Sequence, residues 1–458
     1  MRKTLMVSIS GIRGIFGSGL DPEVLVRYTS AFGAWCAGQP NSNDRPLVIV
    51  GRDARVTGQI CSQVVCATLQ AVGCRVIDLG LATTPTVEMA VIGHRGQGGI
   101  VLSASHNPAE WNALKLLNGK GEFLSPEEGR EVIDLAEQGA DLTVPWDKIG
   151  SLESGTYLDE HIQAILDLPF IDPGAIANRD FRVVVDGINS IGGVAIPALL
   201  RAIGVRDEQI VRVNCDPTGL FAHVAEPLPE NLIDTIEVVR TSGADIGIVV
   251  DPDADRLALI QDGGVYFSEE LTQVVAADFL WRFRTGPFAT NLSSSRAIED
   301  VAARYGAAVH RSAVGEINVV KKMQEVGAVL GGEGNGGVIL PDLHYGRDGL
   351  VGTAMVLQHL ANLGASMTDV RADLPAYHIV KQKTQIGDLD PDALLGRMLD
   401  RYAGEQISTI DGVKIDFEEG WVHMRKSNTE PIIRVYSEAS TQERARELGQ
   451  RFMAELVA

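Results

Sequence analysis

One pattern recurs three times along the chain and constrains its fold more than any other feature. In each copy a short apolar strand leads into a small polar loop, an amphipathic helix, a glycine and a second strand. The copies begin at Leu47–Val50, Val183–Val185 and Phe288–Asn291. Continuous apolar strands that alternate with helices indicate largely parallel sheets covered on both faces. The pattern therefore predicts an α/β fold with three similar domains.

The segment 373–458 has a different character and predicts a small α+β domain. We expect strands at Gly412–Phe417, Gly420–Met424 and Ile432–Tyr436, and then a helix from about Thr441 to Leu456. Seams that contain Pro and Gly separate the repeats from one another. We therefore expect four domains, at residues 1–150, 151–256, 257–372 and 373–458.

The charge balance limits the partners of the chain. Asp and Glu total 60 against 40 Lys and Arg, a net charge of −20. Such a surface repels nucleic acid and anionic lipid, so we expect neither as a partner. The five cysteines include no CxxC pair and indicate free thiols in a reducing compartment. With no apolar run near the ~18 residues of a membrane span, we expect a cytoplasmic protein that binds a small molecule.

The first segment with chemical potential is Ser103–Pro108, which follows the apolar run Gly99–Leu102. Its serines are expected where a strand ends, and open α/β sheets place ligands at such ends. A serine needs an activating neighbour to act as a nucleophile or phosphate carrier, and His106 and Lys115 are the nearest candidates. An Asn-Pro turn with capping serines is the alternative interpretation.

The second segment, Asp251–Arg256, carries carboxylates at Asp251, Asp253 and Asp255 directly after an apolar strand. Oxygen ligands of this kind suit Mg²⁺. Without a cation, three clustered carboxylates would repel one another strongly. A solvated acidic loop is the alternative, but the preceding strand favours a position inside a cleft.

The third and fourth segments offer groups for a sugar and for a phosphate. Glu333 and Asn335 stand among the glycines of Gly332–Gly337, where an accessible backbone and polar side chains suit vicinal sugar hydroxyls. Arg425 and Arg434 flank hydroxyl and amide donors, a combination that suits a phosphate dianion. These donors are Ser427, Asn428 and Thr429. A plain turn remains the alternative for each segment.

Taken in order, the motifs of this chain resemble those of the α-D-phosphohexomutase superfamily, which comprises phosphomannomutases, phosphoglucomutases and phosphoglucosamine mutases. The resemblance extends nearly from end to end. The matching segments are Ser10–Gly14, Gly51–Arg55, Ser103–Pro108, Pro227–Asn231, Asp251–Arg256, Gly332–Gly337 and Arg425–Arg434.

The resemblance implies four domains around a central cleft and a set of site residues. Ser105 would carry a phosphoryl group, and Mg²⁺ would bind Asp251, Asp253, Asp255 and the Ser105 phosphate. The groups that line the reaction site would be Arg13, Lys115 and Arg256, and His106 remains a catalytic candidate from its place next to Ser105. The sugar hydroxyls would bind Glu333 and Asn335. The phosphate that is not reacting would bind Arg425, Ser427, Asn428, Thr429 and Arg434.

The activity implied is the interconversion of hexose 6-phosphate and hexose 1-phosphate through phospho-Ser105 and a hexose 1,6-bisphosphate. The Gly332–Gly337 loop is similar to that of an archaeal-type branch, and Gly337 stands where many members have a histidine. The chain also has Val314–Glu316 where some members have a second histidine. We expect a phosphoglucosamine mutase, with phosphomannomutase or phosphoglucomutase as the alternative, in a monomer or homodimer.

Two rival functions belong to other classes of protein. A Mg²⁺-dependent sugar phosphatase could use the aspartate cluster, but it would not need the phosphate-binding arginines. A non-catalytic sugar-phosphate-binding protein could keep those arginines, but it would not carry a phosphate on Ser105.

Overall fold

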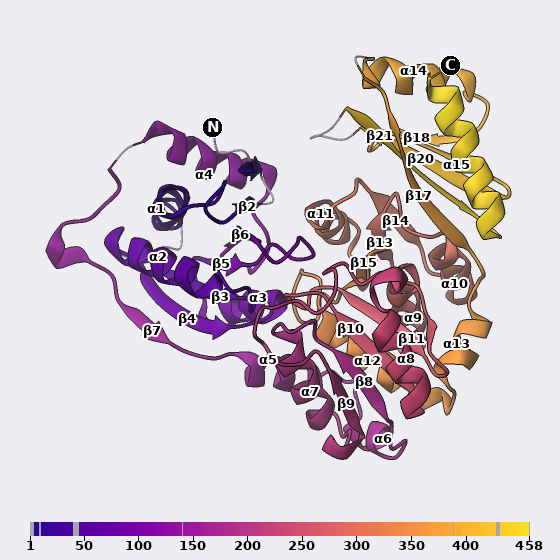
Figure 1. Cartoon of the computed structure of the whole chain (residues 1–458), viewed down its shortest axis with the longest axis horizontal. Coiled ribbons are helices and arrows are strands. Elements are labelled where there is room, and N and C mark those ends of the chain that lie inside the picture. Colours follow the sequence, from indigo (N-terminus) through magenta and orange to yellow (C-terminus); the bar gives the residue numbers. More distant parts are fainter. Residues whose placement is uncertain are drawn as a thin grey trace. The chain divides into compact units, whose positions relative to one another are not determined.

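The structure, a computed structural model, describes residues 4–8, 11–39, 45–139, 141–387, 389–426 and 431–457. The chain forms two compact units. The first consists of Met1–Thr272 and Asn335–Val370, and the second of Gln273–Gly334 and Arg371–Ala458. Figure 1 gives the positions of the helices and strands within these units.

The first sheet, in the first unit, has the strand order β1-β2-β6-β5-β3-β4-β7. Its strands are β1 (Met6–Ser8), β2 (Gly11–Ile15), β3 (Leu47–Arg52), β4 (Arg75–Leu81), β5 (Gly98–Leu102), β6 (Trp111–Asn118) and β7 (Leu152–Ser154). The strands β5, β3, β4 and β7 run parallel, whereas β6, β2 and β1 pair antiparallel. The sheet is therefore mixed, with a parallel centre.

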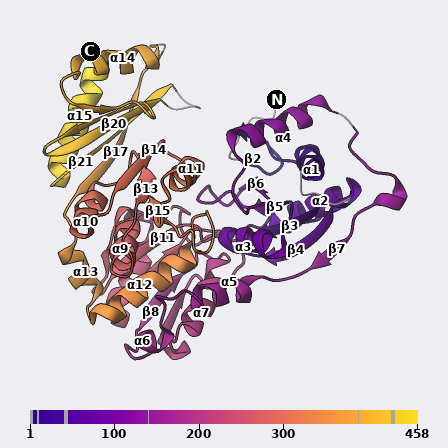
Figure 2. The same cartoon turned by 180° about the vertical axis from the view of Figure 1, so that it is seen from behind.

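Helices cover both faces of this sheet. They are α1 (Pro22–Ala37), α2 (Gly58–Ala71), α3 (Thr84–His94) and α4 (Pro126–Gln138). Val48 and Val50 pack with residues of α1, α2 and α4, while the intervening Ile49 packs with α3. This alternation is the period of a strand that is buried on both faces, and Figure 2 shows the same elements from behind.

The second sheet has the order β12-β11-β10-β8-β9. Its strands are β8 (Val183–Asp186), β9 (Ile210–Val213), β10 (Ile246–Val250), β11 (Leu257–Gln261) and β12 (Val265–Tyr266). The neighbouring helices are α5 (Leu158–Leu166), α6 (Pro173–Ala177), α7 (Gly192–Ala202) and α8 (Ile233–Ser242), with short 3₁₀ turns at Trp146–Lys148, Asp207–Gln209 and Pro229–Asn231. β10 pairs parallel with β8 and antiparallel with β11, so the loop 251–256 joins two adjacent strands of one sheet.

The third group of strands lies in the second unit. β13 (Phe288–Asn291) pairs parallel with β14 (Val309–Ser312) and with β15 (Leu330–Glu333). The helices here are α10 (Ala297–Tyr305) and α11 (Glu316–Val326). Along the chain, α9 (Glu269–Trp281) precedes these strands, and β16 (Gly337–Ile339), α12 (Gly349–Leu363) and α13 (Met367–Asp373) follow them. The three predicted repeats are confirmed as β3-α2-β4, β8-α7-β9 and β13-α10-β14.

The C-terminal sheet is antiparallel, with the order β17-β21-β20-β19-β18. Its elements are β17 (His378–Gln385), α14 (Pro391–Arg401), β18 (Gln406–Ser408), β19 (Val413–Phe417), β20 (Gly420–Lys426), β21 (Ile432–Ala439) and α15 (Gln442–Val457). The predicted strands correspond to β19, β20 and β21, and the predicted helix to α15. The structure adds β17 and β18, whose sequences are less apolar than those of the predicted strands, and the helix α14.

Candidate active site

Ser105 lies just beyond β5, every residue of which is buried. Its side chain is nearly buried, and its hydroxyl donates to Asp251 Oδ2 over 2.7 Å. The backbone of Ser105 has a φ of +47°, in the left-handed region that residues with a side chain rarely adopt. Because such strain persists only where the surroundings impose it, the conformation indicates a functional position.

Arg55 fixes the main chain of the Ser103–Pro108 loop. Its guanidinium donates to the carbonyl oxygens of Ser105 and Asn107, and it also pairs with Asp53 at 2.9 Å. Ser103 Oγ donates to Asp53 Oδ2 over 2.7 Å and accepts from the Ser105 amide. The loop is therefore fixed by buried hydrogen bonds before any ligand arrives.

The three aspartates of the second motif converge after the buried strand β10. Asp251, Asp253 and Asp255 are buried, and an oxygen of each lies within 4.8 Å of the others. Among the described residues, Asp253 Oδ1 and Asp255 Oδ1 are buried without a hydrogen-bond partner. Buried carboxylate oxygens without donors are costly unless a cation binds them. The donor set therefore fits Mg²⁺, which prefers carboxylate oxygens.

Cationic side chains contact the Oδ2 atoms of Asp253 and Asp255. Lys115 Nζ lies 2.5 Å from Asp253 Oδ2 and 3.5 Å from Asp255 Oδ2. Arg347 Nη2 lies 2.8 Å from the same oxygen of Asp255. Thr84 donates a further hydrogen bond to Asp253 Oδ2. These contacts orient Asp253 and Asp255 so that one oxygen of each remains for another ligand.

Neighbouring charges shift the pKa of Asp251 and the pKa of Asp255 in opposite directions. Burial, together with repulsion from Asp255 and Asp253, raises the pKa of Asp251 well above its usual value. Burial would also raise the pKa of Asp255, but Arg347, Lys115 and Arg256 outweigh it and hold that pKa below the usual range. Asp251, the carboxylate nearest Ser105, is therefore the one whose charge is least compensated by protein cations.

The remaining residues predicted for the reaction site lie in the same unit. His106 Nδ1 is 3.4 Å from Ser105 Oγ, and burial together with Arg256 lowers the pKa of His106 to about 3. Arg13, on β2, donates to Asn107 Oδ1, and burial lowers its pKa, with Arg256 contributing. The backbone amide of Arg256 donates to Asp251 Oδ1. The structure thus brings Ser105, His106, Lys115, Arg13 and Arg256 together around the aspartates.

The two predicted sugar-binding residues fall in different units. Glu333 ends β15 in the second unit, where its Oε1 accepts from Asn291 Nδ2 over 2.9 Å and from the Gly315 amide over 3.2 Å. Asn335 lies in the first unit, where its Oδ1 accepts from the Gly337 amide.

The predicted phosphate-binding arginines face each other across two strands. Arg425 on β20 is directly opposite Arg434 on β21 in the antiparallel register, so their side chains share one face. Like charges in such a pair are unfavourable unless an anion or acid lies nearby. Asp411 is one such acid, 2.8 Å from Arg425 Nε. Ser427, Asn428 and Thr429 lie outside the described residues.

Comparison with known proteins assigns the chain to a family over almost its whole length. Models of the phosphoglucomutase/phosphomannomutase domains match in order: α/β/α domain I at residues 5–142, domain II at 159–264, domain III at 268–377 and the C-terminal domain at 380–455. The chain belongs to this family. It is therefore a phosphohexomutase, an isomerase that transfers a phosphoryl group within a sugar phosphate, and this excludes the phosphatase and the non-catalytic alternatives.

Individual relatives of this phosphohexomutase carry different substrate names. A phosphoglucomutase/phosphomannomutase of Thermococcus kodakarensis is 38% identical over 441 residues, which cover 95% of each chain. A probable phosphoglucosamine mutase of Methanopyrus kandleri is 35% identical over 452 residues, 97% of this chain and 96% of the relative. A crystal structure of a family protein from Burkholderia thailandensis superimposes with a TM-score of 0.85 at 26% identity and covers 98% of both chains. These comparisons do not select one sugar.

The phosphohexomutase site contains residues to which sequence reasoning assigned no role, namely Arg55, Thr84 and Arg347. Arg55 belongs to a motif used for the resemblance, and Arg347 follows the sugar loop closely, so their positions gave some signal. Thr84 begins α3 and gave none, because a threonine there reads as an ordinary helix start.

A second buried polar cluster in the phosphohexomutase fixes the loop that carries Arg347. Asp348 Oδ2 lies 2.9 Å from His161 Nε2 and 3.3 Å from His344 Nε2, and Asp348 Oδ1 accepts from the first amides of α12. Burial would lower the pKa of His344, but Asp348 and Glu88 raise it to about 10. A protonated His344 thus neutralises part of the acid charge beside it.

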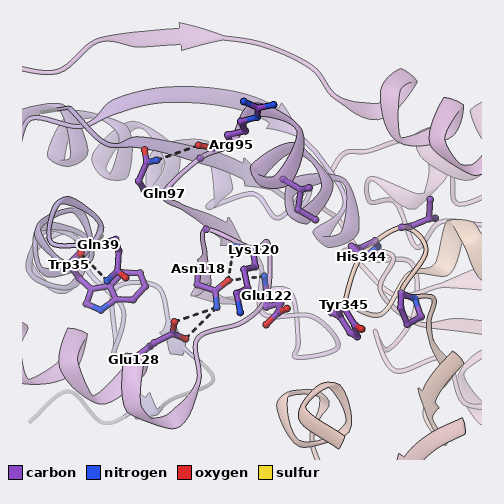
Figure 3. A pocket seen from close by; sticks show the side chains of 15 residues that line it. Trp35, Gln39, Arg95, Gln97, Asn118, Lys120, Glu122, Glu128, His344 and Tyr345 are labelled. Atoms are coloured by element: carbon purple, nitrogen blue, oxygen red, sulfur yellow. Dashed lines mark hydrogen bonds between the residues drawn. The ribbon is translucent and has the colours of Figure 1, made fainter. Parts of the chain in front are cut away.

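A separate cavity of about 790 Å³ opens on the first unit of the phosphohexomutase (Figure 3). Polar side chains such as Asn118, Lys120, Glu128 and Tyr345 line it. The described residues that line this cavity include none of those predicted for the reaction, so we assign it no part in catalysis. No helix of the described chain is both long enough and apolar enough to cross a membrane.

Proposed function

We propose that this phosphohexomutase interconverts glucosamine 6-phosphate and glucosamine 1-phosphate through phospho-Ser105 and a 1,6-bisphosphate. The observation that carries the mechanism is the 2.7 Å contact of Ser105 Oγ with Asp251. Beside it, Asp253 and Asp255 each have a buried oxygen without a hydrogen-bond partner among the described residues. Mg²⁺ held by the three aspartates would offset the charge of a phosphoryl group on Ser105.

The transfer requires one bond to form and one to break at phosphorus. A hydroxyl oxygen of the hexose phosphate bonds to the phosphorus of phospho-Ser105, the bond to Ser105 Oγ breaks, and the hydroxyl proton passes to a protein group. Lys115 and His106 are the candidates for this proton transfer, because His106 lies beside Ser105 and Lys115 lies beside Asp253. Arg13 and Arg256 would offset charge on the transferring group.

The second half of the cycle reverses these bonds at the other end of the sugar. The 1,6-bisphosphate turns end for end, Ser105 Oγ attacks its second phosphoryl group, and phospho-Ser105 is restored. The phosphate that is not reacting would then bind Arg425 and Arg434, and Glu333 and Asn335 would bind the sugar hydroxyls. A lost charge-assisted contact is worth ~1.5–3 kcal/mol, so Arg425→Ala should raise KM roughly tenfold to a hundredfold in both directions.

The Arg425 prediction can be checked by steady-state kinetics in both directions, with and without added bisphosphate. A bisphosphate that cannot be held after turning escapes, so added hexose 1,6-bisphosphate should partly rescue the variant. Arg444→Ala is the matched control, because Arg444 is an exposed arginine of the same domain paired with Glu419. An effect confined to one direction would show that Arg425 does not serve a shared distal site.

The choice of glucosamine rests on the relatives of this chain. The Methanopyrus kandleri relative is named as a probable phosphoglucosamine mutase, which favours this sugar. The name of the Thermococcus kodakarensis relative instead favours glucose and mannose phosphates, so a phosphoglucomutase/phosphomannomutase is the second candidate. Measuring kcat/KM for glucosamine, glucose and mannose 6-phosphates side by side tests the choice. A higher kcat/KM for glucose or mannose would refute the glucosamine assignment.

A further inference from the structure

We propose that Asp411 is a positioning residue for the Arg425 guanidinium, and that it ties the phosphate-binding arginine to the part of the fold that carries Glu333. This inference rests on the proposed function, because it takes Arg425 to bind the phosphate that is not reacting. All of the residues involved belong to the second compact unit.

Asp411 contacts two partners with one carboxylate oxygen. Its Oδ2 lies 2.8 Å from Arg425 Nε and accepts from the Val314 amide over 3.0 Å. The Asp411 and Arg425 side chains are only 23% and 24% exposed. The contact is an ion pair and not a hydrogen bond, because Arg425 Nε has no hydrogen-bond partner among the described residues. The charge of Asp411 attracts one edge of the planar guanidinium, and the Nη donors that suit a phosphate lie toward the other edge. Asp411 can therefore orient Arg425 without occupying the edge needed for phosphate.

His423 on β20 holds the main chain of Asp411 in place. Its Nε2 donates to the Asp411 carbonyl oxygen over 2.6 Å, and its Nδ1 is 2.9 Å from Ser293 Oγ. Burial lowers the pKa of His423 to about 4, so the ring is neutral at pH 7. Because Nε2 faces a carbonyl and must carry the proton, Nδ1 accepts from the Ser293 hydroxyl. This hydrogen bond joins the C-terminal sheet to the loop that follows β13.

The same loop leads to Glu333. Asn291 Oδ1 accepts from the Ser293 amide over 2.9 Å, and Asn291 Nδ2 donates to Glu333 Oε1 over 2.9 Å. A second route is shorter, because the adjacent amides of Val314 and Gly315 donate to Asp411 and to Glu333, respectively. Gly315 has a φ of +115°, which only glycine adopts readily. Two chains of hydrogen bonds thus connect the partner of Arg425 with Glu333.

A substrate held at both ends depends on the distance between the groups that bind those ends. Glu333 would bind the sugar and Arg425 the distal phosphate, so their spacing must match each sugar phosphate in turn. A guanidinium held by Asp411 loses less side-chain freedom when the phosphate binds. Removing the Asp411 charge should therefore weaken substrate binding through Arg425 while the chemistry at Ser105 continues.

The test is a double-mutant cycle with Asp411→Asn and Arg425→Ala. Asparagine can still accept from the Val314 amide but carries no charge for Arg425. We expect Asp411→Asn to raise KM about threefold to tenfold in both directions with little change in kcat. In the Arg425→Ala background the same change should have no further effect, because the positioned group is absent. Glu419→Gln, which removes an exposed acid of the same domain, is the control and should leave KM unchanged.

Each other outcome identifies which statement fails. An unchanged or lower KM for Asp411→Asn overturns the inference, and so does an equal rise in the Arg425→Ala background, which would indicate a purely structural role. If Arg425→Ala itself leaves KM unchanged, the distal phosphate site of the proposed function is wrong and the inference falls with it. Asp411→Glu keeps the charge but displaces it, so a smaller rise in KM is expected. This second variant keeps the test decisive if the asparagine variant does not fold.

Discussion

Replacing each of the two serines of the Ser103–Pro108 loop separates the phosphocarrier from its support. Ser105→Ala removes the hydroxyl that would carry the phosphoryl group, so we expect turnover to fall by about 10⁴-fold or more. The change costs little stability, because alanine meets the same backbone strain at a φ of +47° and only the hydrogen bond to Asp251 is lost. That loss amounts to about 1.5 kcal/mol, the net contribution of one intramolecular hydrogen bond.

Ser103→Ala should give the opposite result. Its hydroxyl donates to Asp53 over 2.7 Å and accepts from the Ser105 amide over 3.0 Å, and Ser103 is fully buried. The substitution removes both hydrogen bonds and leaves a buried amide without its acceptor, at a cost of about 2–3 kcal/mol. We therefore expect a lower Tm than that of Ser105→Ala, with turnover reduced by no more than about tenfold, because the Ser103 oxygen does not react.

Two measurements distinguish the serines. A mutase assay gives turnover, and the intact mass of the purified protein reports a phosphoserine as an increment of about 80 Da. The increment should be present in part of the wild-type protein and of Ser103→Ala, and absent from Ser105→Ala. An active Ser105→Ala variant together with an inactive Ser103→Ala variant would refute the assignment of the phosphocarrier.

Three further predictions follow from the aspartate cluster, the buried histidine and a constrained glycine. Asp253→Asn should raise the Mg²⁺ concentration for half-maximal activity roughly tenfold or more, and full activity after exhaustive chelation would contradict a metal requirement. The pKa of His423 is about 4 in the folded protein, which is below its unfolded value. The neutral ring therefore stabilises the fold above pH 6.5, and this stabilisation is lost as pH falls toward 4. That loss is at most about 3 kcal/mol. The free energy of unfolding of His423→Asn should therefore depend less on pH in the acid range than that of the wild-type protein. An equal dependence would argue against a neutral buried ring. Gly336→Ala should lower Tm more than Gly364→Ala, because both have positive φ but only a Cβ at Gly336 would meet Leu257 O, at 2.5 Å; equal values would refute this account.

The sequence was sufficient to predict the elements whose pattern is local. β5 and β10 are continuous apolar strands, so the loops that follow them, with Ser105 and Asp251, could be placed at strand ends. β17 escaped prediction because its residues alternate between half-buried and exposed, and its polar sequence resembles a loop. Local patterning therefore located the motif loops more reliably than the less apolar strands.

Contacts between distant segments could not be predicted in the same way. Arg55 reaches the carbonyl of Ser105 across 50 positions, and Arg347 reaches Asp255 across 92. Periodicity and capping signals extend over a few residues only, and they carry no information on which distant loops meet. The register that sets Arg425 opposite Arg434 depends likewise on the pairing of β20 with β21, which a strand pattern alone leaves open.

The charges around Asp251 explain why phosphate and metal should depend on each other at this site. Asp255 is compensated by Arg347 and Lys115, and Asp253 by Lys115, whereas Asp251 accepts a hydrogen bond from the Ser105 hydroxyl. Phosphorylation of Ser105 would remove that donor and set a second anion beside Asp251. In a buried site, two adjacent anions repel strongly unless a cation lies between them. Lys115 and Arg347 already pair with the other two aspartates, and Arg256 acts on Asp251. A bound cation would supply further positive charge, and the oxygens of Asp253 and Asp255 without hydrogen-bond partners are suited to hold it.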